Sequence, residues 1–259
     1  MEKNSAGSAV RKKRRILAAF LLLAAAMASG ILLNICIGSV SVSLPEILKI
    51  LSGQPMGEKQ QTIILQLRLP RTILAAVLGG ALALSGYLLQ TFFHNPIAGP
   101  FVLGISSGAK MVVALVMVFF LGRGRTVNSA GMIAAAFAGA MLSMGFVLLM
   151  SRRIRRMSML VVSGVMIGYI CSAVTELVVT FAQDADIVNL HNWSQGSFSG
   201  TTWSNVRAVC ICVTLIFLLV FLMSKPLSAY QLGESYALNL GVNVRLLRIG
   251  MVVFSSILS

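Results

Sequence analysis

Apolar stretches of about 20 residues recur along the chain, and they constrain its fold more than any other feature. A helical stretch of this length crosses the roughly 30 Å hydrocarbon core of a bilayer. Of the 259 residues, 57% are hydrophobic and only 11% are charged, which is about half the charged share of a typical soluble domain. The sequence therefore predicts an all-α polytopic membrane protein.

We expect six complete transmembrane helices and the start of a seventh. They cover residues 16–38, 72–93, 101–121, 129–150, 159–182 and 208–224, and the last run opens near residue 249. The first run also has the basic start and the small-residue end that are typical of a secretory signal peptide. Because its apolar part continues through Leu33, which is long for a signal peptide, we favour a retained helix.

The basic residues predict the orientation of these helices, because cytoplasmic loops are enriched in Lys and Arg. Basic residues end the tail over residues 1–15 and fill the RRIRR segment over residues 152–156. An even number of spans separates the two segments, so both are expected in the cytoplasm, together with the loop over residues 225–248. This placement and anionic lipids account for the net charge of +14, so nucleic acid is not an expected partner.

Basic residues also occur where they are not expected. The loop before the second span would face the outer side, where positive charge is sparse. It nevertheless carries Lys49, Lys59, Arg68 and Arg71, and the two arginines stand in the segment RLPRT directly before an apolar run. The residues alone leave open whether the loop merely tolerates these charges or uses them.

The segment HNPIAGP, over residues 94–100, interrupts the helical pattern. Two prolines and a glycine within seven residues cannot continue a helix. Irregular backbone near membrane depth is tolerated where it is packed in protein or lines a watery cavity. The segment is therefore a candidate gate, and an ordinary tight turn between two helices is the alternative.

Glu176 lies inside the span over residues 159–182, about two helical turns from its expected outer end. An ionisable side chain at such a place is a candidate functional residue, because its burial in lipid is costly. It could contact a polar substrate in an outer cavity, carry a proton, reach the membrane interface or bond a neighbouring helix. The sequence leaves these alternatives open.

The sequence shows no catalytic apparatus. It contains no GxxxxGK[ST] phosphate loop, no Ser/His/Asp or Cys/His arrangement and no cluster of metal ligands. The four cysteines lie in apolar runs, where we interpret them as buried apolar side chains. We therefore expect no enzyme activity, no catalytic residue, no metal and no cofactor bound by this chain.

Several motifs, in a consistent order, resemble the permease subunits of ABC importers for iron-siderophore complexes, haem and cobalamin. They are LRLPRTILAAVLGGALALSGYLLQTFFHNPIAGPFVLGISSGA, SGVMIGY, WSQGSFSGTTW and QLGESYALNLGVNVRLLR, and the match covers nearly all of the chain from Thr62 onward. The resemblance implies a homodimeric permease with about ten helices in each subunit. It also implies two ATPase subunits that bind ATP and Mg in the cytoplasm, and a substrate-binding protein that docks outside.

The resemblance further implies roles for particular residues. Arg68 and Arg71 would dock the binding protein by pairing with its carboxylates, which would explain their place on the outer rim. A cytoplasmic gate would be formed by Asn95, Ile97, Met157 and Ser158. The cobalamin permeases have a small hydroxyl residue where Met157 stands, so the chain departs from their pattern at this position.

The segment LSAYQLGESYALNLGVNVRLLR, over residues 227–248, resembles the coupling helices that fit a cleft in the ATPase. A loop that merely lies on the membrane is the alternative. Apolar residues recur every four positions, and glycines punctuate the turns. This predicted apolar strip comprises Leu232, Tyr236, Leu240 and Val244. The expected ATPase contacts are Leu232, Gly233, Glu234, Tyr236, Ala237, Leu240 and Gly241.

We therefore expect the permease subunit of an ATP-driven importer for an iron-siderophore complex, in a bacterial cytoplasmic membrane. Haem or cobalamin import is the alternative within the family, and a proton-coupled carrier that uses Glu176 is the alternative outside it. The family normally continues through three more helices and a further outer docking loop, whereas this sequence stops early in the run that opens near residue 249. We do not expect this chain alone to transport.

Overall fold

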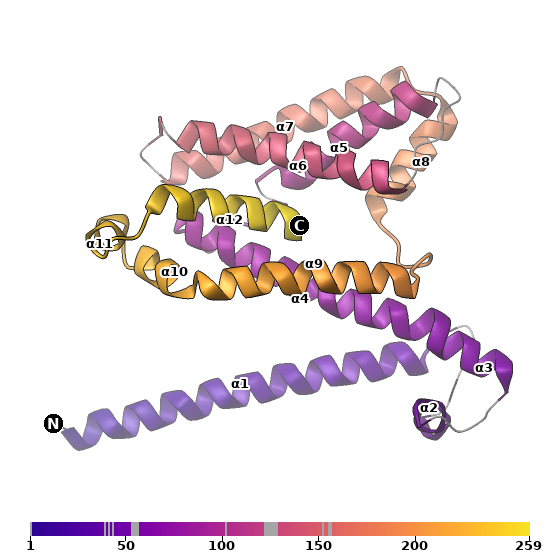
Figure 1. Ribbon diagram of the computed structural model, residues 1–259, viewed down its shortest axis with the longest axis horizontal. Coiled ribbons are helices and arrows are strands. Elements are labelled where there is room, and N and C mark those ends of the chain that lie inside the picture. Colours follow the sequence, from indigo (N-terminus) through magenta and orange to yellow (C-terminus); the bar gives the residue numbers. More distant parts are fainter. Residues whose placement is uncertain are drawn as a thin grey trace. The chain divides into compact units, whose positions relative to one another are not determined.

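The computed structural model describes the chain except for residues 1, 39, 41, 43, 53–56, 102, 122–128, 152, 155 and 156. All regular secondary structure in this described part is helical (Figure 1), as the apolar runs predict. Most of the basic RRIRR segment lies outside the described residues. Of its arginines, only Arg153 is described, and its side chain is exposed.

The helices follow one another along the chain with short connections. In order, they are α1 (Glu2–Cys36), α2 (Leu44–Leu51), α3 (Glu58–Thr62), the π-helical segment η1 (Ile63–Arg68), α4 (Leu69–Phe93), α5 (Ile105–Val116), the π-helical segment η2 (Met117–Leu121), α6 (Ser129–Ser151), α7 (Met157–Thr180), α8 (Asp184–Gln195), α9 (Trp203–Leu222), α10 (Ser224–Gln231), α11 (Glu234–Asn239) and α12 (Val244–Leu258).

Within the described residues, five helical stretches are long and apolar enough to cross a membrane. They are Arg11–Cys36, Lys59–Phe93, Ala130–Ser151, Ser158–Thr180 and Trp203–Leu222, and a shorter apolar helix covers Ile105–Phe120. The second stretch begins well before residue 72, because η1 joins the polar α3 to α4 without a break. In the run over residues 101–121 the helix begins only at Ile105, after Gly104 has adopted a φ of 74°.

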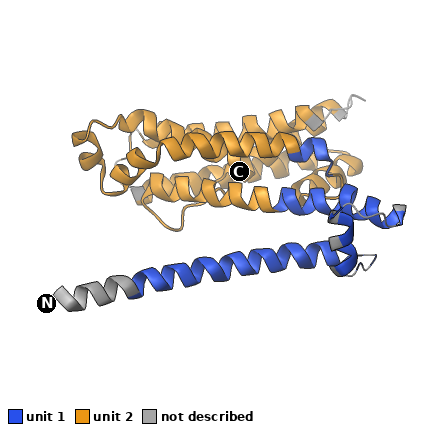
Figure 2. Ribbon diagram, turned by 60° about the horizontal axis from the view of Figure 1, so that its bottom comes forward, with its two compact units in different colours: residues 1–75, 201–206 blue, residues 76–200, 207–259 orange. Residues whose placement is uncertain are grey.

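Residues 1–75 and 201–206 form one compact unit, which is blue in Figure 2. An apolar cluster joins the end of α1 to α2 and η1 in this unit. Its buried members are Ile35, Val42, Ile47, Ile50 and Ile64. The indole nitrogen Nε1 of Trp203 donates a hydrogen bond of 2.9 Å to the carbonyl of Leu65, which attaches the first residue of α9 to η1.

Arg68, the last residue of η1, is turned into this unit and is only 9% exposed. Its guanidinium donates to the carbonyls of Ile35 at 2.6 Å and Cys36 at 3.2 Å, and also to that of Val40. The last carbonyls of a helix have no partner within the helix, and a cation there complements the helix dipole. Arg68 therefore caps α1. A Cβ atom at Gly38 would lie 2.5 Å from its Nη2 atom, so a larger residue there would displace the guanidinium.

Residues 76–200 and 207–259 form the second compact unit, which is orange in Figure 2. Glycines let its helices approach closely, as small residues do in lipid. A Cβ atom at Gly104 would lie 2.8 Å from the Cα atom of Gly168, and one at Gly108 would lie 2.6 Å from the carbonyl oxygen of Gly139. The start of α5 is thus packed against both α7 and α6.

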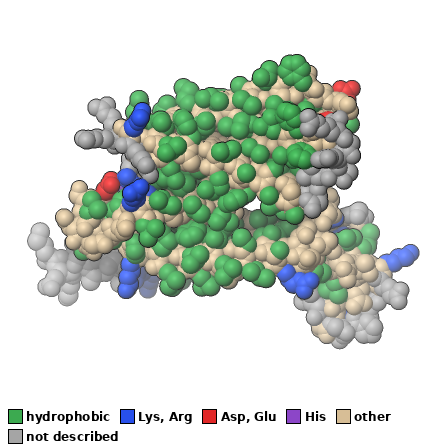
Figure 3. Space-filling view, turned by 45° about the horizontal axis from the view of Figure 1, so that its top comes forward, with side chains coloured by type: hydrophobic (Ala, Val, Ile, Leu, Met, Phe, Trp, Pro, Cys, Tyr) green, Lys and Arg blue, Asp and Glu red, His purple; other side chains and the backbone are tan. Residues whose placement is uncertain are grey.

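Large hydrophobic side chains are exposed along the long helices α6, α7 and α9 of this second unit. Figure 3 shows that hydrophobic side chains cover much of the visible face of the structure. Exposed apolar side chains of this extent are favourable in hydrocarbon. The distribution fits a helical bundle whose middle lies within a bilayer.

Replacing Arg68 by Gln should destabilise the protein, because buried carbonyls at the end of α1 lose a charged donor. Such a loss costs about 1–3 kcal/mol of unfolding free energy, and it should appear as a lower thermal midpoint of the purified protein in detergent. Lys59→Gln is the matched control, because it removes an exposed positive charge from the same continuous helix. Equal midpoints for Arg68→Gln and Lys59→Gln would contradict the capping role.

Candidate functional site

The turn that follows α4 is ordered by its own side chains. His94 has a φ of 48°, the one positive value among the described non-glycine residues. The side-chain oxygen Oδ1 of Asn95 accepts a 3.0 Å hydrogen bond from the backbone N–H of Ile97, and the backbone N–H of Asn95 reaches the carbonyl of Gln90 at 3.1 Å. Ile97 is left 73% exposed. Asn95 therefore fixes the turn, and Ile97 projects from it.

The other two predicted gate residues lie at the start of α7. Met157 is its first residue, and the position of this side chain lies outside the described structure. Ser158 is exposed. Within the described residues no hydrogen bond joins Ser158 to Asn95 or Ile97, so a gate made of these residues stays a prediction.

The segment between α9 and α12 carries an exposed apolar surface on α10 and α11. The exposed fractions are 72% for Leu232, 48% for Tyr236 and 60% for Leu240. Together with Lys225 and the small residues of α10 they line an open groove of about 340 Å³. We call this surface the α10–α11 groove. Three of the four residues in the predicted apolar strip therefore meet on one surface.

The fourth residue of the predicted strip, Val244, does not belong to the groove. Gly241, with a φ of 77°, turns the chain after α11, and Val244 then begins α12 with only 5% of its surface exposed. Gly233, with a φ of 131°, similarly separates α10 from α11. Ala237 is fully buried and packs α11 onto the core. Of the predicted contact residues, the glycines and Ala237 shape the segment, while the large side chains form its surface.

Glu234 makes an ion pair within the chain. In the first turn of α11, its Oε2 atom accepts a 2.8 Å hydrogen bond from Nη2 of Arg248 on α12. The same arginine donates from Nε to the hydroxyl of Tyr230 at 3.1 Å. Tyr230 is completely buried. It was not among the predicted site residues, because nothing in its local sequence marks it as more than one apolar position.

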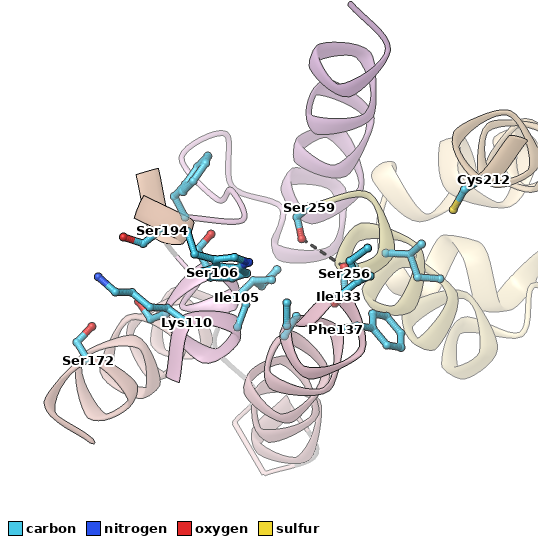
Figure 4. Close-up of a pocket in the computed structure, with 17 residues that line it drawn as sticks. Ile105, Ser106, Lys110, Ile133, Phe137, Ser172, Ser194, Cys212, Ser256 and Ser259 are labelled. Carbon is cyan, nitrogen blue, oxygen red and sulfur yellow. Dashed lines mark hydrogen bonds between the residues drawn. The ribbon is translucent and has the colours of Figure 1, made fainter. Parts of the chain in front are cut away.

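A cavity of about 940 Å³ lies between α5, α6, α7, α8, α9 and α12 (Figure 4). Its walls are mainly apolar, with Ile133 and Phe137 on one side. Lys110 is the single charged residue among the described residues that line it, and no described carboxylate lies within ion-pair distance of it. In Figure 4 the hydroxyls of Ser106, Ser172 and Ser194 lie on the same side of the cavity as Lys110.

Lys110 is a functional candidate that the sequence analysis missed. It stands in α5, inside the run predicted to span the membrane, and an ionisable residue at such a place is costly unless it meets water or an opposite charge. That signal was present in the sequence, as it was for Glu176. The cavity can offer an ammonium group and hydroxyl donors to a negatively charged group while its apolar walls contact the remainder of a ligand.

The remaining predicted residues are placed elsewhere. Glu176 has an exposed side chain on α7 and does not line the cavity that contains Lys110. Arg71 is half-buried, and Arg68 is held by the carbonyls at the end of α1. Docking by Arg68 would require these bonds to break, so the docking role of the two arginines stays a prediction. No group of three or more potential metal ligands occurs among the described residues.

Comparison with known proteins identifies the family. The model of the FecCD transport family matches residues 16–259. The chain is 38% identical over 201 residues to a vitamin B12 import system permease protein, BtuC, of Klebsiella pneumoniae. This aligned region covers 78% of this chain and 60% of that protein. It is 34% identical over 235 residues to BtuC of Escherichia coli O127:H6, and here the aligned region covers 90% of this chain and 68% of that protein.

A solved structure has the same fold. It shows an inward-facing conformation of a metal-chelate type ABC transporter, and it aligns with a TM-score of 0.74 at 25% identity over 94% of this chain and 73% of that chain. The predicted all-helical permease fold is thereby confirmed. The chain therefore belongs to the FecCD transport family, and so to the ABC importer permeases that its motifs resemble.

Proposed function

We propose that this chain is the permease subunit of an ATP-driven importer that moves an iron-siderophore complex across a bacterial cytoplasmic membrane. The complex would be received from a substrate-binding protein outside, and a second permease subunit would complete the path. Family membership supports the transport role. The observation that carries the proposal is the α10–α11 groove, an exposed apolar surface on a segment that also carries basic residues.

The α10–α11 groove suits a protein partner better than lipid. Leu232, Tyr236 and Leu240 converge on one hollow, with Lys225 at its edge. Concave apolar surfaces with a polar rim are typical of protein contacts. ATP and Mg would be bound by that partner, an ATPase, because the sequence has no phosphate loop. Nucleotide-driven closure of two such subunits would then shift the helices.

The number of apolar helices supports the proposed orientation. From the N-terminal tail to α10 the chain passes along five long apolar helices and the shorter one that begins at Ile105. An even number of crossings returns α10 and α11 to the side of the N-terminus. The basic residues Lys225, Arg245 and Arg248 around this segment favour the cytoplasm on that side.

The charge of Lys110 bears on which molecule is transported. Catecholate and carboxylate chelates of ferric iron are anions, and so are the propionates of haem, whereas a corrinoid carries no comparable excess of negative charge. Lys110 is exposed and is the single charged residue among the described residues that line this cavity, so it can attract an anion. The positive charge of Lys110 therefore supports an anionic cargo, such as a ferric chelate or haem, over cobalamin. Cobalamin remains the second candidate, because the relatives reported above are named as vitamin B12 import permeases.

A proton-coupled carrier that uses Glu176 is the alternative of another class. Such a carrier would need neither an ATPase nor a surface for one. The exposed side chain of Glu176 allows it to contact water or lipid headgroups as well as a cavity. The two classes differ in whether uptake depends on the α10–α11 groove.

Tyr236→Asp should abolish binding of the ATPase subunit, because it places a charge in the apolar surface that the ATPase would cover. The measurement is co-purification of the ATPase with the permease, together with ATP-dependent uptake into membrane vesicles. Leu238→Asp is the matched control, because Leu238 is similarly exposed on α11 but does not line the groove. Uptake that survives the loss of ATPase binding would favour the carrier, and equal losses for both variants would contradict the assignment of the groove.

Lys110→Met should reduce uptake of an anionic ferric chelate several-fold, because the cavity loses its positive charge while its volume is nearly kept. Lys110→Arg, which retains the charge, should preserve most of the uptake. The measurement is the initial rate of uptake of a radiolabelled ferric catecholate, with radiolabelled cobalamin assayed in parallel. Uptake of cobalamin alone by the wild type would contradict the siderophore assignment, and full ferric uptake by Lys110→Met would remove the role of Lys110.

A further inference from the structure

Tyr230 connects the α10–α11 segment to the turn after α4. Its side chain is completely buried. Its hydroxyl donates to the carbonyl of Phe92 at 3.4 Å, and its own backbone carbonyl lies 3.1 Å from the ring nitrogen Nε2 of His94. One residue at the end of α10 therefore contacts both the last turn of α4 and the first residue of the candidate gate.

His94 is held in an uncommon backbone conformation at this point. A positive φ is strained for a residue that has a Cβ atom, and it persists where surrounding contacts fix it. Here the imidazole packs on the Tyr230 ring, with 4.7 Å between ring centroids, and hydrogen bonds to the Tyr230 carbonyl. Asn95 and Ile97 follow directly, so the anchored histidine determines where the turn begins.

Two further sets of hydrogen bonds restrain the contact between the α10–α11 segment and α4. The side-chain nitrogen Nε2 of Gln231 donates to the hydroxyl of Tyr87 at 3.2 Å and to that of Thr91 at 3.0 Å, both on α4. Arg248 of α12 bonds the Tyr230 hydroxyl and pairs with Glu234 of α11. The end of α4, the turn after it, α10, α11 and the start of α12 thus form one hydrogen-bonded block.

The protonation state of Tyr230 suits this role. Burial raises the pKa of its hydroxyl, although the hydrogen bond and the charge of Arg248 act in the opposite direction. The hydroxyl therefore stays protonated near neutral pH. It can donate to the Phe92 carbonyl while it accepts from Arg248, so both bonds exist at once.

We propose that Tyr230 and His94 are the positioning residues that make the gate turn move together with the α10–α11 segment. A displacement of α11 would then move Ile97, because breaking the several hydrogen bonds that join α10, α11 and α12 to α4 and its turn costs more than shifting the block as a unit. The proposal rests on the proposed function, in which an ATPase displaces α11. It goes beyond that function by naming the contacts through which the displacement reaches the gate.

Two variants test the proposal. Tyr230→Phe keeps the buried ring and loses the hydroxyl bonds to α4 and α12. His94→Gly keeps the positive φ, which glycine adopts freely, and loses the ring contact and the bond to Tyr230. Tyr169→Phe is the control, because Tyr169 is 69% exposed on α7 and has no hydrogen bond to the block among the described residues.

The readout is the coupling between ATP hydrolysis and transport in the permease reconstituted with its ATPase and binding protein. For the double variant Tyr230→Phe/His94→Gly, we expect transport per ATP hydrolysed to fall several-fold while ATP hydrolysis changes little. Labelling of an Ile97→Cys variant with a maleimide should respond to ATP in the wild-type background, and the double variant should lose that response. Tyr169→Phe should retain the wild-type ratio and response.

The outcomes separate the inference from the proposed function. An unchanged transport ratio with a normal labelling response in the double variant would overturn the inference and leave the importer intact. A proportional fall in hydrolysis and transport, with the labelling response retained, would also overturn it, since it indicates a merely structural role. A wild-type complex without ATP-dependent transport would overturn the proposed function and the inference with it.

Discussion

The need to satisfy backbone hydrogen bonds in hydrocarbon governs this structure. Within lipid, a helix is the form in which a single chain satisfies its own N–H and C=O groups, so breaks in the helices require other partners. At the end of α1 the partner is the guanidinium of Arg68, which takes up three carbonyls. After α4, the side-chain oxygen of Asn95 accepts from the backbone N–H of Ile97, and at the end of α10 the ring of His94 bonds the carbonyl of Tyr230. Arg68, His94 and Asn95 therefore act at the ends of helices.

Sequence patterns predicted the features that depend on residues close together in the chain. Runs of apolar residues predicted the helices, and the prolines and glycine of HNPIAGP predicted the break over residues 94–100. The start of the second long helix was not predictable in this way, because the polar α3 resembles a loop until η1 joins it to α4. Val244 was assigned to an exposed strip because a four-residue period ignores the turn at Gly241.

Features that depend on distant partners could not be predicted. Arg68 contacts carbonyls more than 25 residues earlier in the chain, and Tyr230 contacts Phe92 and His94 across the bundle. Neither set of contacts can be recognised from the neighbouring sequence. Lys110 is different, since a lysine within an apolar run is visible at once. The structure adds that it faces a cavity with hydroxyl groups around it, and this gives it a chemical role.

These observations fit one transport mechanism. An exposed apolar groove would receive an ATPase, a hydrogen-bonded block would carry its movement to Ile97, and a cavity with one lysine would accept an anionic chelate. The first two of these roles require α11 to lie in the cytoplasm. This requirement can be tested by replacing the four native cysteines and introducing Ser235→Cys on α11, or Gln183→Cys before α8 as the outer reference. Both original residues are exposed.

Labelling with a membrane-impermeant maleimide is then compared between intact and permeabilised cells. Ser235→Cys is expected to react only after permeabilisation, whereas Gln183→Cys should react in intact cells. Reaction of Ser235→Cys in intact cells would place the α10–α11 groove outside, where no ATPase could reach it, and would contradict the account.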